Sequence, residues 1–263
     1  MGRIIYKVSL TKNIGGLSMK FKIFGNNLQV VKLMLDRGEK LYAEAGALVM
    51  LYGDIEMKAK ARGGLFKSLG RKLLTGETFF MTEFIAKGNG YAGFAGKVPG
   101  TIYPIDIEMD GIWMAQRDAF LVAEDSVDMS IAFQKKLGSI FFGGEGLILQ
   151  KYQGKGKVFI HAAGDFIEVD LKEGEKLKVD TGSAVAWEET VDYDISRIKG
   201  IGSMLFGGEG IFMTELKGPG KVLIQSMNIR ELALALSPFM AGRGQSSGNS
   251  GGVVGNIIGN SFN

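Results

Sequence analysis

Three stretches of this 263-residue chain repeat one another, and this repetition restricts its possible folds more than any other feature. Each stretch carries a glutamate (Glu77, Glu145 and Glu209) spaced 68 and then 64 residues from the next. The stretches read LLTGETFFMTEFIAKGNGYAG from Leu73, FFGGEGLILQKYQGKGKVFIH from Phe141 and LFGGEGIFMTELKGPGKVLIQ from Leu205. A weaker match upstream joins LYAEAGALVM from Leu41, WMAQRDAFLV from Trp113 and LKVDTGSAVA from Leu177. The body therefore divides into units of about 19–96, 97–163 and 164–227.

The units read as β-strands, because apolar residues recur at every second position in short runs bounded by glycine. In KVFIHA, for example, Val158, Ile160 and Ala162 share one face of a strand. A unit of this size cannot bury both faces of its strands alone. We therefore expect an all-β body of β-roll or barrel type, in which the three units close on one core with approximate threefold pseudosymmetry.

Composition excludes several kinds of chemistry. The chain has no cysteine and one histidine, which excludes disulfides, thiolate nucleophiles, zinc–thiolate centres and multi-histidine metal sites. The 31 basic and 28 acidic residues are too evenly matched to indicate nucleic acid from bulk charge. No apolar stretch is long enough to cross a bilayer, and the start lacks a secretory signal. We expect a soluble cytoplasmic protein without a cofactor.

The end of the body has the signals of one helix. Asn228 followed by Glu231 forms an N-cap pattern before IRELALAL, and Pro238 should end the helix, which we place at 229–236. Its apolar stripe is expected to pack on the β-body, with binding to a partner as the alternative. Residues 242–263 should form a flexible glycine-rich tail, and 1–18 an N-terminal extension, with translation starting at Met1 or Met19.

The segment GNNLQVVKLMLDRGEKLYAEAGALVM, the three G-E strand pairs and the closing IRELALALSPFM resemble a conserved family related to the mitochondrial biogenesis protein of altered inheritance of mitochondria. The resemblance covers residues 19–240. It implies a fold like that of the tryptophan RNA-binding attenuation protein, no established enzymatic activity, and a eukaryotic branch tied to the mitochondrial inner membrane. RNA binding is not carried over, since fold does not imply function and no RNA-contact motif is visible.

The repeated glutamates are the candidate metal site. Pseudosymmetry would gather Glu77, Glu145 and Glu209 around one axis, where they could hold calcium or magnesium. The alternative is that each accepts backbone N–H groups at its own turn, far from the others. His161 aligns with Gly93 and Gln225, so no ligand repeats there, and a surface or half-buried strand histidine is expected, with a catalytic role as the alternative. The G-x-G patterns join strand to strand, which disfavours phosphate binding at a helix.

The loop before each marker glutamate mixes basic, glycine and large apolar residues, and the three loops would emerge at one end of a pseudosymmetric body. They form a candidate interaction surface for an anionic membrane or a protein partner, and inward packing or contact with another subunit is the alternative. The surface consists of Phe66, Lys67, Leu69, Arg71, Lys72, Ile140, Phe141, Leu205 and Phe206.

These features favour a non-catalytic scaffold or interaction protein that forms a homo-oligomer, for which a trimer is one candidate. The alternative is a nucleic-acid-binding module, suggested by the fold analogy and the basic loop at 58–72. A small-molecule or metal-binding protein, or an enzyme acting on a sugar or small metabolite, comes third.

Overall fold

The structure, a computed structural model, describes residues 19–62, 79–135, 147–198 and 211–240. These residues form nineteen β-strands, two helical segments of four and three residues, and one helix of twelve residues. The predicted all-β class is therefore confirmed. The first unit contains β1 (Phe21–Phe24), β2 (Val30–Leu35), β3 (Lys40–Glu44), β4 (Leu48–Tyr52), β5 (Ile55–Arg62), β6 (Phe79–Ala86) and β7 (Gly90–Ala95). The second contains β8 (Gly100–Asp106), β9 (Trp113–Gln116), β10 (Phe120–Glu124), β11 (Val127–Lys135), β12 (Leu147–Gly154) and β13 (Lys157–Ala163). The third contains β14 (Phe166–Leu171), β15 (Lys176–Asp180), β16 (Ala184–Glu188), β17 (Asp192–Ile198), β18 (Ile211–Lys217) and β19 (Gly220–Gln225).

All three units use the same antiparallel pairings. The last strand of each unit (β7, β13, β19) lies between β2 and β4, between β8 and β10, and between β14 and β16. The strand before the last (β6, β12, β18) lies between β3 and β5, between β9 and β11, and between β15 and β17. Equivalent strands can therefore be compared residue by residue across the units.

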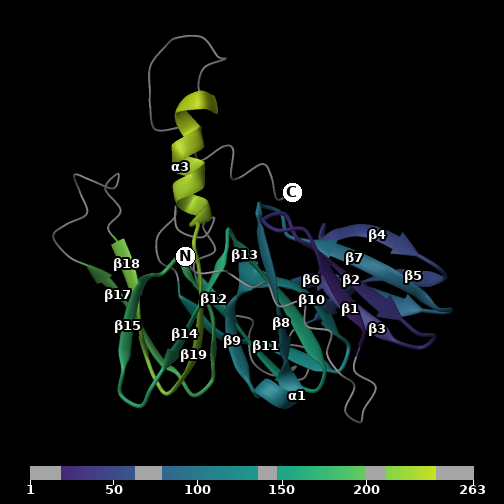
Figure 1. Cartoon of the computed structure of the whole chain (residues 1–263), viewed down its shortest axis with the longest axis horizontal. Helices are drawn as coiled ribbons and strands as arrows, with labels where there is room; N and C mark the ends of the chain where they lie inside the picture. Colours follow the sequence, from purple (N-terminus) through teal and green to yellow (C-terminus); the bar gives the residue numbers. More distant parts are fainter. Residues whose placement is uncertain (1–18, 63–78, 136–146, 199–210, 241–263) are drawn as a thin grey trace, which may run out of the picture.

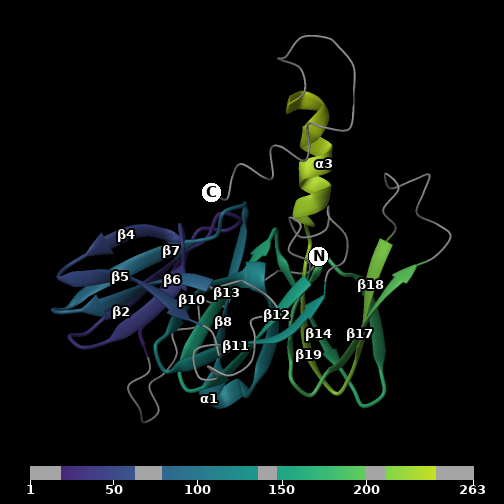
Figure 2. The same cartoon turned by 180° about the vertical axis from the view of Figure 1, so that it is seen from behind.

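Neighbouring units are joined by one strand pair each. Strand β10 of the second unit pairs with β3 of the first, and β16 of the third pairs with β9 of the second. Figures 1 and 2 show the outcome, a row with β4 and β5 at one end and β15 and β17 at the other. The described strands form four open sheets. Closure with threefold pseudosymmetry is therefore not confirmed, because no strand pair in the described ranges joins the third unit back to the first.

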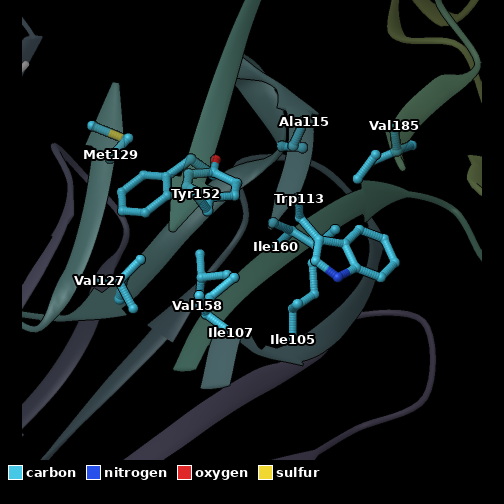
Figure 3. Close-up of a cluster of buried hydrophobic side chains, with 14 of the residues drawn as sticks. Ile105, Ile107, Trp113, Ala115, Val127, Met129, Tyr152, Val158, Ile160 and Val185 are labelled. Atoms are coloured by element: carbon cyan, nitrogen blue, oxygen red, sulfur yellow. The ribbon is translucent and has the colours of Figure 1, made fainter. Parts of the chain in front are cut away.

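Three apolar clusters, rather than one core, hold the row together. The central cluster surrounds Trp113 and Tyr152 of the second unit (Figure 3), and it also takes Tyr42 from the first unit and Val185 from the third. The outer clusters likewise mix residues of neighbouring units. Each unit thus completes the core of its neighbour, which explains why a single unit could not bury its own strands.

The remaining elements are α1 (Ile107–Asp110), the 3-10 turn η2 (Arg117–Ala119) and α3 (Ile229–Met240). The predicted cap is present, since the Arg230 backbone N–H donates to Asn228 Oδ1 at 2.9 Å. The helix nevertheless continues past Pro238, and it projects away from the sheets instead of packing on them (Figures 1 and 2). Within the part of the chain that is described, no helix is long and apolar enough to cross a membrane.

Candidate interaction site

The site residues predicted from the sequence fall outside the described ranges. This holds for the glutamates Glu77, Glu145 and Glu209 and for the nine residues of the three basic–apolar loops. Both hypotheses therefore stay predictions. Within residues 19–62, 79–135, 147–198 and 211–240, no group of three histidine or acidic residues is placed to hold a metal ion.

His161 has the environment of a structural residue. It lies in β13 with 8% of its surface exposed, and burial lowers its pKa, so the imidazole is neutral near pH 7. Glycines leave room for the ring: a Cβ added at Gly96 would lie 2.3 Å from it, and one at Gly100 would lie 2.8 Å from its Nε2. His161 does lie on a strand, but it is buried and not at the surface or half-buried as predicted, because the glycines opposite it let the strands close over the ring.

The strand pairings correct the alignment of His161 with Gly93. In each unit the last strand and its partner β4, β10 or β16 share a β-bulge at the same place, which aligns Gly93 with Phe159 and Leu223. His161 therefore matches Ala95. The two-residue difference arises in the turn between β6 and β7, which is longer than the equivalent turns in the other two units. An alignment that counts residues from the marker glutamates does not detect this extra length.

Equivalent positions on three strands carry charges in the second unit and apolar groups in the first. In the second unit Lys157 Nζ contacts the Asp106 carboxylate, and the Lys157 backbone N–H donates to Glu124 Oε1 at 2.9 Å. Burial raises the pKa of Glu124, although that N–H partly offsets the effect. Asp170, Lys221 and Glu188 occupy the same positions in the third unit, where the Lys221 backbone N–H donates to Glu188 Oε2.

The first unit has Met34, Tyr91 and Tyr52 at these positions. The two tyrosine rings are stacked with centroids 4.9 Å apart, and Lys32 Nζ lies 3.5 Å from the centroid of Tyr91. Tyr52 and Met34 are exposed. The first unit therefore presents apolar and aromatic side chains where the other units have charged groups.

Strand β4 is the most exposed apolar strand described. The exposed fractions of Val49, Met50, Leu51 and Tyr52 are 56%, 36%, 36% and 63%. The equivalent strands β10 and β16 have four buried residues out of five, because β3 and β9 of the preceding units cover them. Within the described residues, no unit precedes the first one and β4 pairs only with β7.

Strand β15 lies at the opposite open edge. Its equivalents β3 and β9 pair on both sides, whereas β15 pairs only with β18 among the described strands. Its exposed lysines, Lys176 and Lys178, form ion pairs with Glu215 at 2.7 and 3.2 Å. Strands β4 and β15 are thus the two described edges whose equivalents elsewhere in the chain pair with a strand of a neighbouring unit.

Known proteins resemble the chain over most of its length. The mitochondrial biogenesis AIM24 family matches residues 21–227. An uncharacterised protein of Streptococcus pyogenes serotype M6 is 28% identical over 218 residues, which are 80% of this chain and 86% of that protein. A crystal structure of a Streptococcus pyogenes protein superposes with a TM-score of 0.68 at 27% identity, covering 84% of this chain and 99% of the other. These comparisons do not confirm a fold like that of the tryptophan RNA-binding attenuation protein.

Proposed function

The chain belongs to the mitochondrial biogenesis AIM24 family, and from this premise we propose that it is a non-catalytic scaffold that assembles with copies of itself through strand β4. The observation that carries the proposal is the contrast between β4 and its equivalents. The same strand position is buried twice within the chain and exposed once, with four consecutive apolar residues. Exposed apolar strand edges favour pairing with another chain.

The chemistry of the described side chains supports a role without catalysis. The single histidine is buried beneath glycines, and its depressed pKa leaves it uncharged at neutral pH. The buried Lys157 is engaged with carboxylates on neighbouring strands. Charged groups of this kind stabilise the fold, whereas an acid–base catalyst needs access to a substrate. The proposal places the protein in the cytoplasm, which fractionation of cells that express the tagged chain would test.

We expect the full chain to sediment as an assembly at micromolar concentration and Met50→Lys to sediment as a monomer. Lysine at this position would carry an unpaired charge into an apolar contact, where burial is costly. The melting temperature of the separated chain should not change, since Met50 is already partly exposed. Met109→Lys is the matched control, because Met109 lies in α1 with 83% exposure.

Sedimentation velocity over a range of concentrations distinguishes the outcomes. An unmodified chain that is a strict monomer would remove self-association from the proposal. An assembly that Met50→Lys leaves intact would place the contact on another surface.

Contact with a membrane or protein partner is a second candidate, and helix α3 favours it. Its side chains Ile229, Leu236 and Phe239 are exposed along one stripe, and 84% of Phe239 is accessible. Such a stripe can enter the boundary of a lipid bilayer. We expect the chain to co-sediment with phosphatidylglycerol vesicles and Phe239→Ser to lose most of this binding, while Met109→Ser retains it. Equal binding by both variants would exclude α3 as the contact.

A further inference from the structure

We propose that strand β15 of a second copy covers β4, so that the copies join head to tail. The inference rests on the proposed self-association and adds the identity of the partner strand. Both junctions inside the chain are built in this way: β3 of the first unit pairs antiparallel with β10 of the second, and β9 of the second with β16 of the third. Among the described strands, β15, the equivalent of β3 and β9, and β4, the equivalent of β10 and β16, lack this pairing. A second copy therefore supplies the missing neighbour.

The internal junctions also give the register. Tyr42 lies opposite Ala123 at the first junction, and Met114 lies opposite Trp187 at the second. Lys178 and Leu51 occupy the equivalent positions in β15 and β4. The intermolecular pair should therefore place Lys178 opposite Leu51, with Val179 opposite Met50 and Leu177 opposite Tyr52.

Side chains next to the pairing agree with this assignment. Leu121 and Val122 of β10 are buried in the apolar cluster of the first unit. Val185 and Ala186 of β16 are buried in the central cluster, which surrounds residues of the second unit. Their equivalents in β4 are the exposed Val49 and Met50. In the part of the chain that the structure describes, these two residues lack the apolar cluster of a preceding unit, and the third unit of another copy would provide it.

The third unit presents part of the complementary surface. Met81 of β6 and Leu149 of β12 reach into the cluster of the following unit. Their equivalent in β18 is Met213, which is only partly buried and lies next to β15. Met213 should pack against the β4 surface as Met81 and Leu149 do at the internal junctions.

Charge favours the head-to-tail pair over a β15–β15 pair, and packing favours it over a β4–β4 pair. Pairing β15 with another β15 would bring Lys176 and Lys178 close to their copies, and like charges opposite one another destabilise strand pairs. Strand β4 has no charged residue, so it offers these lysines no like charge. Glu215 pairs with both ammonium groups, but its single negative charge leaves the three side chains with a net positive charge, and edge lysines discourage unselective pairing. Two β4 strands could pair, but neither would supply the apolar cluster that Val49 and Met50 lack.

A head-to-tail contact uses β4 of one copy and β15 of the next, so an open assembly of any length keeps one free β4 edge at one end and one free β15 edge at the other. Such heterologous contacts produce a ring when the rotation between copies closes, and an open chain when it does not. The assembly should therefore contain neither an isolated twofold dimer through β4 nor one through β15.

The absence of cysteine permits a direct test by disulfide cross-linking of the full chain. Leu51→Cys and Lys178→Cys are purified separately, mixed and oxidised. The mixture should give roughly tenfold more disulfide-linked dimer than either variant alone, because opposite residues on antiparallel strands lie within disulfide reach. Lys176→Cys mixed with Leu51→Cys is the matched control. It is an exposed lysine on the same edge, two positions out of register, and should cross-link much less.

Sedimentation of the same samples distinguishes failure of self-association from failure of the β4–β15 pairing. Cross-linking of Leu51→Cys with itself would preserve self-association but overturn the head-to-tail partner. Assembly without a cross-link in any mixture would overturn β15 as the occupant of β4. Absence of assembly in the unmodified chain would overturn the proposed function together with this inference.

Discussion

Phe159→Ala is expected to lower the free energy of unfolding by about 3–5 kcal/mol, the usual cost of truncating a buried phenylalanine. The Phe159 side chain is completely buried in the cluster of the first unit, although it belongs to β13 of the second. Phe21 packs edge-to-face against it with ring centroids 5.0 Å apart. The truncation leaves a cavity at the junction of two units, and neither unit can fill it alone. Urea unfolding followed by circular dichroism would measure the loss.

Phe239→Ala is the control, because this phenylalanine lies on the projecting helix and is largely exposed. Its removal should change the free energy of unfolding by no more than about 0.5 kcal/mol. Equal effects of the two substitutions would contradict the placement of Phe159 in a core shared between units.

Asp106→Ala is expected to cost about 3 kcal/mol, because it removes the carboxylate that contacts a buried lysine. Only 6% of the Lys157 side chain is exposed, and its ammonium group contacts Asp106 on the neighbouring strand β8. Removing one member of a buried ion pair leaves the other charge without compensation. Glu124 still lies nearby, so the loss should fall at the lower end of the usual range. Thermal and urea unfolding at neutral pH would measure it.

The exposed pair of Lys151 and Glu189 provides the comparison. Glu189→Gln should cost less than about 1 kcal/mol, since solvent screens surface ion pairs. If Asp106→Ala were as mild, the Lys157 ammonium group could not be buried as the structure places it.

The strands and the repeat units were predictable from the sequence, because alternating apolar residues and glycine turns are local signals. KVFIHA illustrates this, since it lies within strand β13. The open row was not predictable in the same way. Whether three units close depends on which edges meet, and no residue in a single unit specifies that relation. The alignment of His161 with Gly93 was wrong because it assumed turns of equal length.

For helix α3, too, the sequence predicted the element but not the surface that it contacts. Asn228 and Glu231 predicted where the helix begins, and a hydrogen bond to Asn228 confirms that start. Its apolar stripe predicted burial, but amphipathicity does not identify the surface that covers a helix. Pro238 was expected to end the helix, and α3 instead extends to Met240.

The candidate site could have been noticed in the aligned sequences. LVMLY aligns with FLVAE and AVAWE, and it alone ends without a glutamate. An apolar strand usually indicates burial, so this difference by itself does not predict an exposed surface. It gained significance only when the structure showed that β10 and β16 are covered and β4 is not. The interaction surface predicted from the sequence, in the three basic–apolar loops, lies outside the described ranges.

Hydrogen–deuterium exchange of the backbone amides in β4 and β15 tests the central claim most directly. In the assembled chain, the amides of both strands that point away from β7 and β18 should exchange slowly, because each strand is paired on its second side. In Met50→Lys the same amides should exchange fast, while those of β10 and β16 stay protected in both proteins. Fast exchange of β4 and β15 in the unmodified chain, equal to that in Met50→Lys, would contradict the account.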